Sequence, residues 1–105
     1  MARSAIRQMK RAVAAGSRTG AQADAVILAE QAALSLLARS ISFGHGRLAV
    51  IRLAMAVQAG ADVPQEHWIY CREAAARSKD DGIRALFLEA AQAAEIRSAR
   101  AAHTH

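Results

Sequence analysis

Two side chains past the middle of the sequence have the types and spacing for nucleophilic chemistry. His67 and Cys71 are four residues apart, a spacing that places side chains side by side on a helix, and a thiol beside an imidazole is the beginning of a nucleophilic site. No glycine-rich loop lies nearby to stabilise an oxyanion, and Cys71 shares a helical face with the apolar Trp68 and Ala75. We therefore predict a buried, inert thiol, and we expect no catalysis, no cofactor and no metal site.

A second set of chemically active residues lies in the first twenty, which contain five basic side chains and no acidic one. These residues are Arg3, Arg7, Lys10, Arg11 and Arg18. The rest of the chain carries nine basic and nine acidic groups, so the net charge of +5 originates in this segment. Three of the arginines recur at a spacing of four, which brings like charges together on a helix. An anionic partner would relieve the repulsion between them.

Several anionic partners fit this segment. Arginine binds phosphate and carboxylate in a bidentate fashion, so nucleic acid and an acidic protein surface are both candidates. A membrane surface is not expected, because the segment contains no Trp, Phe or Leu. Mitochondrial transit peptides have a similar composition, but twelve arginines against two lysines and abundant alanine are typical of a GC-rich bacterial genome. A plain amphipathic helix with a solvated basic face is the remaining alternative.

A helix-turn-helix is the other nucleic-acid motif that we considered, over residues 52–70. Ala56 lies four positions before Gly60, as close packing of two such helices requires. The match then weakens, because Glu66 stands where the second helix should bury an aliphatic side chain. The exposed face of that helix would also carry a single basic residue, whereas faces that read DNA are usually rich in Arg, Lys, Asn and Gln.

One histidine lies between two glycines, in the sequence Gly44-His45-Gly46. Two glycines in three residues predict a sharp turn, with His45 exposed on a loop. Because loops often carry binding residues, we include His45 with the five basic residues as candidates for contact with a partner or with phosphate.

The composition predicts an all-α protein that folds as one domain over residues 1–105. Alanine, the strongest helix former, occurs 28 times, while aromatic residues make up only 4%. A single cysteine excludes an intrachain disulfide and fits a cytoplasmic location. No apolar run approaches the roughly 18 to 20 residues that cross a bilayer, so we expect no membrane span. Because alanine buries little area, we expect the chain to self-associate, most simply as a homodimer.

Apolar periodicity and turn residues divide the chain into about five helices. They are predicted over residues 3–15, 21–41, 47–59, 63–77 and 82–100. Residues 1–20 form a basic N-terminal helix and turn, and residues 21–102 form the body of the bundle. The second helix has a predicted core stripe of Ile27, Leu34, Leu37 and Ile41, widened by Val26 and Ala33. In the last two helices the predicted inner faces are Trp68, Cys71 and Ala75, and then Ile83, Leu86, Phe87, Ala90 and Ala94.

The third predicted helix is apolar nearly all round and is expected at the centre of a compact bundle. The fourth and fifth are expected to form a C-terminal antiparallel hairpin. We interpret the chain as a noncatalytic protein-binding module, a small accessory, adaptor or inhibitor protein that binds a partner with an acidic surface through its basic N-terminal helix and adjoining surfaces. The alternative is a nucleic-acid-binding regulator that contacts phosphate through the same basic face.

Overall fold

Residues 20–103 are described by the structure, a computed structural model, and within this range the chain forms four helices and no strand. The helices are α2 (Gly20–Ser42), α3 (Gly46–Gln58), α4 (Gln65–Arg77) and α5 (Asp81–His103). They match the last four predicted helices to within a few residues, which confirms the all-α class. The first predicted helix, over residues 3–15, lies outside the described residues.

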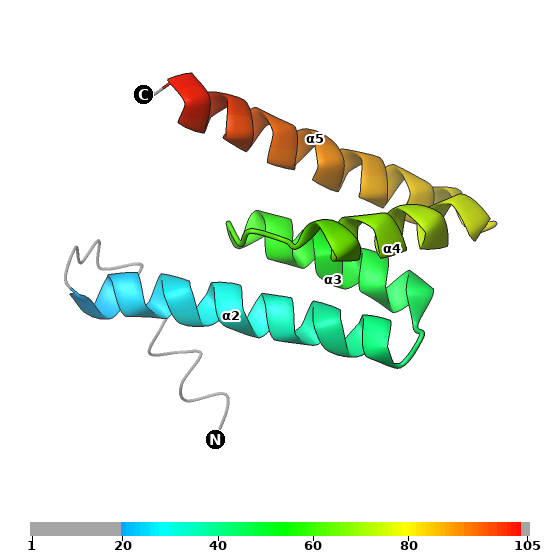
Figure 1. Cartoon of the computed structure of the whole chain (residues 1–105), viewed down its shortest axis with the longest axis horizontal. Helices are drawn as coiled ribbons and strands as arrows, with labels where there is room; N and C mark the ends of the chain where they lie inside the picture. Colours follow the sequence, from blue (N-terminus) through cyan, green and yellow to red (C-terminus); the bar gives the residue numbers. More distant parts are fainter. Residues whose placement is uncertain (1–19, 104–105) are drawn as a thin grey trace.

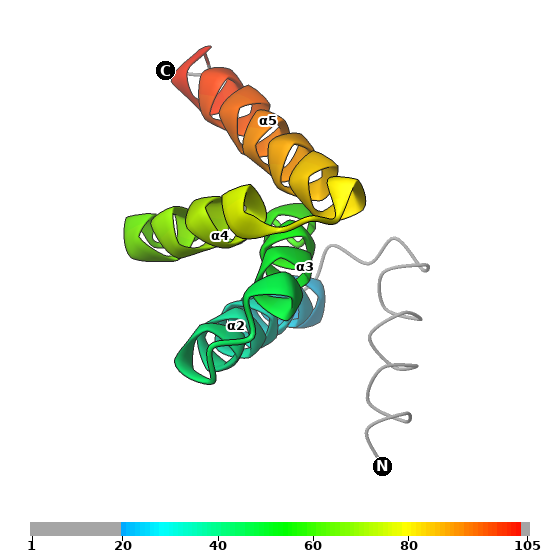
Figure 2. The ribbon, with the colours of Figure 1, turned by 90° about the vertical axis from the view of Figure 1, so that its right-hand side faces the viewer.

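The helix α3 is at the centre of the fold and contacts each of the other three helices. Figure 2 looks along the bundle and shows α2, α4 and α5 arranged around it. The sequence predicted this segment, the third of the five expected helices, to be central. Among the four helices that the structure describes it is the second. Its buried side chains are Ala49, Val50, Leu53, Ala54, Ala56 and Val57.

Two glycine turns connect α3 to its neighbours. After α2, the backbone N–H groups of Gly44 and His45 donate to the carbonyls of Ile41 and Ser40, at 3.0 and 2.9 Å. After α3, Gly60 has a φ of +87°, a left-handed conformation that favours glycine. The sharp turns predicted from the glycines are confirmed.

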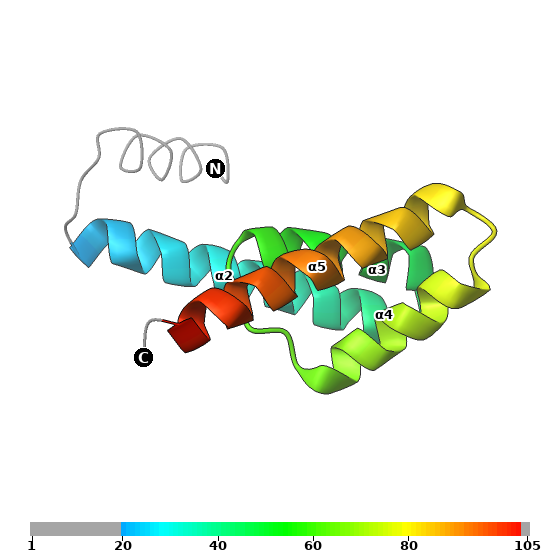
Figure 3. The same cartoon turned by 90° about the horizontal axis from the view of Figure 1, so that it is seen from above.

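The core lies where α3 meets α4 and α5. Leu37 of α2, Leu53 of α3 and Cys71 of α4 are fully buried there. The inner faces predicted for the last two helices are confirmed, because Cys71, Ala75, Ile83 and Ala90 are buried and the other predicted positions pack against them. The helices α4 and α5 diverge from the turn that joins them, so the expected hairpin is an open one (Figures 1 and 3).

The helix α2 differs most from its prediction. Leu37 is buried as expected, but Val26 and Ile27 are 45% and 49% exposed, so the stripe predicted to face the core leaves it toward the N-terminal end. The residues that α2 buries are instead Ala25, Leu37 and Ser40. The helix α2 is also long and apolar enough to cross a membrane, whereas we expected no segment of the chain to be so. Core helices of soluble proteins and signal sequences meet the same criterion of length and composition.

Candidate protein-binding groove

A groove of about 470 Å³ lies between α4 and α5, on the side where the two helices diverge. We call it the α4–α5 groove. Its lining residues are Gln65, Trp68 and Arg72 of α4, and Phe87, Ala91, Ala94, Glu95 and Ser98 of α5. Aromatic and small side chains thus alternate with polar ones, an arrangement suited to holding the apolar side of a ligand while polar groups orient it.

The aromatic part of the groove is formed by two rings from different helices. Trp68 and Phe87 meet edge to face, with ring centroids 6.0 Å apart and planes at 79°. Both rings are half-buried and pack against the core. An edge-to-face pair with this spacing is a favourable aromatic geometry, so the rings hold each other in place while each leaves part of its surface toward the groove.

Alanines on α5 provide the depth of the groove. Ala91 and Ala94 are half-buried and lie one and two turns after Phe87 on the same helix. Because a methyl side chain leaves most of the space between two diverging helices unfilled, the groove stays open beside the aromatic rings. A bulky aliphatic side chain from a ligand would find room beside them.

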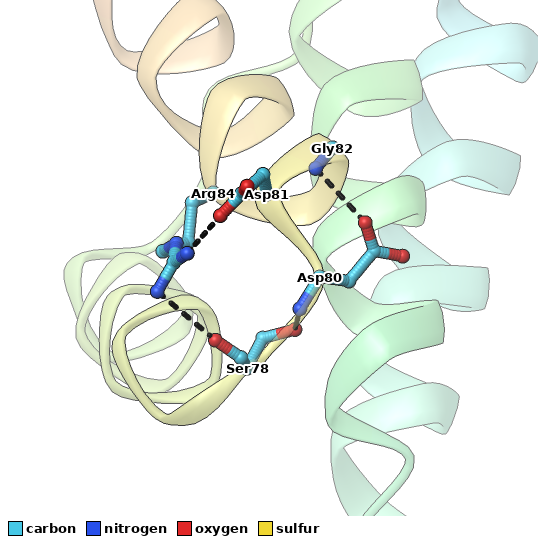
Figure 4. Close-up of polar contacts among 5 residues, drawn as sticks. All are labelled: Ser78, Asp80, Asp81, Gly82 and Arg84. Atoms are coloured by element: carbon cyan, nitrogen blue, oxygen red, sulfur yellow. Dashed lines mark hydrogen bonds and ion pairs between the residues drawn. The ribbon is translucent and has the colours of Figure 1, made fainter.

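The turn that joins α4 and α5 is held by polar contacts, and Figure 4 shows those among Ser78, Asp80, Asp81, Gly82 and Arg84. Asp80 directly precedes α5, and its carboxylate Oδ1 accepts a hydrogen bond of 2.9 Å from the backbone N–H of Gly82. The other carboxylate oxygen, Oδ2, lies 3.1 Å from Arg47 Nη2 of α3. Arg84 pairs with Asp81 and donates to the Ser78 carbonyl. These contacts hold the short segment between the two helices in a tight turn.

A second depression of about 260 Å³ adjoins the groove toward the C-terminal end of α5 and shares Trp68, Ala94 and Ser98 with it. It is closed by Arg97 of α5, whose guanidinium donates hydrogen bonds to the carbonyls of Val57 and Ala61, at 3.4 and 3.0 Å. The C-terminal end of α3 is thereby tied to α5. The helix α5 is therefore tied to the central helix at two places, through Asp80 just before its first residue and through Arg97 near its C-terminal end.

Charged side chains of opposite sign stand on the two rims. Arg72 of α4 and Glu95 of α5 both line the groove and are exposed. No ion pair joins either of them to another residue in the described part of the chain. Each is therefore available to a charge on a ligand.

Cys71 lies beneath the groove and has the chemistry of a core residue. It is fully buried, and burial raises the pKa of its thiol from 9.0 to about 11. The prediction of a buried thiol is confirmed, and this pKa shift is opposite in direction to the depressed pKa that a nucleophilic cysteine needs. The ring nitrogen Nδ1 of His67 is buried with no hydrogen-bond partner within residues 20–103.

Of the residues predicted to bind a partner, only His45 lies within the described part of the chain, and it does not line this groove. Arg3, Arg7, Lys10, Arg11 and Arg18 lie outside the described residues. His45 is exposed at the turn between α2 and α3, as expected, and its ring stacks on Phe43 with centroids 6.1 Å apart. Its side chain makes no capping hydrogen bond to α3.

Sequence reasoning assigned Trp68 and Phe87 to the core and did not identify the groove. Both rings occupy core-facing helical positions, so the periodicity gives no indication that they are also partly open to solvent. The available indication was compositional: Phe87 is followed on the same face of its helix by the small Ala91 and Ala94, which cannot fill the space beside the two rings.

No three His, Cys, Asp or Glu side chains are close enough to hold a metal ion among the residues that the structure describes. Comparisons with protein-family models, with curated proteins and with solved structures find no match to this chain.

Proposed function

We propose that this chain is a noncatalytic protein-binding module that holds an amphipathic helix of a partner protein in the α4–α5 groove. The observation that carries the proposal is the groove itself, in which Trp68 and Phe87 flank space left by small side chains and polar residues form the rims. Grooves between helices commonly bind the apolar face of a helix from another protein. An accessory, adaptor or inhibitor protein works in this way.

The chemistry of the groove defines the ligand. Bulky aliphatic residues at helical spacing would enter beside Trp68 and Phe87 and above the alanines. An acidic side chain on the ligand would face Arg72, and a basic one would face Glu95. The acid-free N-terminal segment, with five basic residues before position 19, adds attraction toward an acidic surface of the same partner.

The alternative function is a nucleic-acid-binding regulator in which Arg3, Arg7, Lys10, Arg11 and Arg18 contact phosphate. It is supported by the same charge distribution, and it makes no use of the groove. The described body of the chain offers little further support, because its basic and acidic groups balance. The two functions therefore depend on different residues and are separable by experiment.

The first experiment selects ligands for the groove from a display library of helix-forming peptides. We expect enrichment of sequences with apolar residues at positions i, i+3, i+4 and i+7. Trp68 is the only tryptophan of the chain, so titration with a selected peptide should shift its fluorescence emission. The variant Ala91→Arg, which places a long charged side chain in the groove, should lose binding.

The matched control is Leu88→Gln, which replaces an exposed leucine of the same helix that does not line the groove. This variant should bind the selected peptides as the unchanged protein does, and thermal unfolding followed by circular dichroism establishes that both variants fold. The proposal is wrong if no amphipathic sequence is enriched, or if Ala91→Arg binds the selected peptides with unchanged affinity.

The second experiment measures fluorescence anisotropy of labelled duplex DNA and single-stranded RNA over a salt series. Phosphate binding should weaken log-linearly with salt, and it should disappear when Arg3, Arg7, Lys10 and Arg11 are changed to Ala. That result would establish the nucleic-acid alternative. Flat traces at low salt would exclude phosphate binding and leave two roles for the basic segment, contact with an acidic protein surface or a solvated face.

A further inference from the structure

The outward side of α2 carries large apolar side chains that nothing in the described fold covers. Leu28 is 58% exposed, Leu36 is 39% exposed, and Phe43, directly after the helix, is 63% exposed. Isolated exposed leucines are ordinary on protein surfaces, but these three lie on one side of one helix. Figure 1 shows α2 along the margin of the fold, with α3 on one side of it.

The spacing of these residues places them in a row. Leu28, Ala32 and Leu36 are four residues apart and Phe43 follows seven residues later, which are same-face spacings on a helix of 3.6 residues per turn. We call these four residues the outer stripe of α2; it extends over about 22 Å at a rise of 1.5 Å per residue. None of them lines the α4–α5 groove.

We propose that the outer stripe of α2 binds the outer stripe of a second copy of this chain, with the two helices antiparallel about a two-fold axis at Ala32. The two leucines of the stripe are symmetric about that position, with Leu28 four residues before it and Leu36 four residues after it. Leu28 of each copy therefore packs against Leu36 of the other. The small side chain of Ala32 at the axis lets the two helices approach closely.

The charges of α2 select the antiparallel orientation. Asp24 lies eight residues before Ala32 and Arg39 lies seven residues after it, and both are exposed. Neither forms an ion pair with another described residue. In the antiparallel arrangement Asp24 of each copy comes close to Arg39 of the other, whereas a parallel arrangement opposes Asp24 to Asp24 and Arg39 to Arg39. Opposite charges favour the first arrangement, and like charges penalise the second.

The aromatic end of the stripe adds area to the same interface. The Arg39 guanidinium carbon lies 5.9 Å from the centroid of the Phe43 ring, so the cation covers part of the ring while leaving most of it exposed. Because a two-fold interface uses the same surface on both copies, the association closes at a dimer and does not continue into a filament.

Sedimentation velocity of the full chain over a wide concentration series tests the proposal. We expect a dimer that dissociates on dilution. Leu28→Gln and Leu36→Gln should each raise the dimer dissociation constant about tenfold or more, because each change removes an apolar contact twice in a symmetric pair. Glutamine is a good helix former, so the fold should persist, and circular dichroism checks this. The matched control is Leu88→Gln, 60% exposed on α5, which should leave the dimer intact.

A charge exchange tests the orientation. Asp24→Arg alone and Arg39→Asp alone should each weaken the dimer, because each places like charges opposite one another. The double variant should recover most of the loss, because its two charges are exchanged and again pair with opposite charges on the other copy. Recovery would not occur in a parallel pair or in a dimer built elsewhere on the surface.

Several results would overturn the proposal. One is a wild-type chain that stays monomeric at every concentration; another is a dimer that Leu28→Gln and Leu36→Gln leave unchanged. Cosedimentation with anionic vesicles provides a separate arm. If the wild-type chain is monomeric and binds vesicles, and Leu28→Gln abolishes that binding, the outer stripe is a lipid-binding surface. If removal of residues 1–19 alone dissociates the dimer and the stripe variants do not, that segment forms the interface.

Discussion

Arg97, near the C-terminal end of α5, donates a hydrogen bond of 3.0 Å to the backbone carbonyl of Ala61, 36 residues earlier in the chain. The same guanidinium also reaches the carbonyl of Val57, in the last turn of α3. Carbonyls at a helix C-terminus lack hydrogen-bond donors within the helix and carry partial negative charge. A guanidinium that donates to them supplies the missing hydrogen bonds and a compensating positive charge. The contact ties α5 to the C-terminal end of the central helix.

We predict that Arg97→Ala lowers the free energy of unfolding by about 1 to 3 kcal/mol, since it removes charged hydrogen bonds to half-buried carbonyls. Chemical denaturation followed by circular dichroism measures the change. Gln92→Ala, an exposed position on the same helix, is the matched control and should change stability little. Equal stability of the two variants would show that the Arg97 contact contributes nothing measurable.

Gly60, in the turn after α3, lies close to the Arg97 contact. It has a φ of +87°, and a Cβ added there would lie 3.4 Å from Arg97 Nη1 and 3.7 Å from a carboxylate oxygen of Glu30. We predict that Gly60→Ala lowers the unfolding free energy by about 1 to 2 kcal/mol, because alanine is strained in the left-handed region. The control is Gly20→Ala, where nothing lies within 4 Å and where alanine favours the helix. In thermal denaturation, a Gly60→Ala midpoint at or above that of Gly20→Ala would contradict this reading of the turn.

Local patterns in the sequence were sufficient for most of the fold. The glycines at positions 44 and 60 follow helices that ended where predicted, and the repeats through Cys71 and Ile83 gave the correct inner faces of α4 and α5. The apolar circumference of residues 47–59 identified the central helix. These features depend on turns and periodicities within a few residues, which the sequence records directly.

The features that failed depend on which surfaces meet. Val26, Ile27 and Leu28 are consecutive, so they point in three directions around α2 and no single contact with α3 can bury them all. The pattern gave no means of deciding that the small Ala25, rather than these large residues, would face the core. The opening between Trp68 and Phe87 likewise depends on the angle between α4 and α5, which contacts such as that of Arg97 with Ala61 help to set. Such contacts link residues far apart in the sequence and leave no local pattern.

Asp80 has two separable roles at the turn before α5, and two substitutions distinguish them. Its Oδ1 atom caps the helix and its Oδ2 atom pairs with Arg47, whose side chain is 73% exposed. We predict that Asp80→Ala lowers the unfolding free energy by about 1 kcal/mol through loss of the cap. Asp80→Asn should cost much less, because asparagine still caps and an exposed ion pair contributes little. Urea denaturation of both variants tests the order, and an Asn variant as unstable as the Ala variant would assign the stability to the ion pair.

The buried thiol of Cys71 makes the stability of the protein depend on pH in the alkaline range. Its pKa is about 11 in the folded chain against 9.0 when exposed, so the folded state holds this proton more tightly. The resulting stabilisation is fully present below pH 9 and is lost as pH rises from about 9 to about 11, up to about 2 to 3 kcal/mol. Other groups titrate in the same range, so the measurement is the difference in unfolding free energy between the unchanged protein and Cys71→Ala at several pH values. As pH rises, the unchanged protein should lose stability relative to Cys71→Ala. A difference in unfolding free energy that stays constant from pH 8 to pH 11 would show that the thiol is not desolvated as its burial indicates.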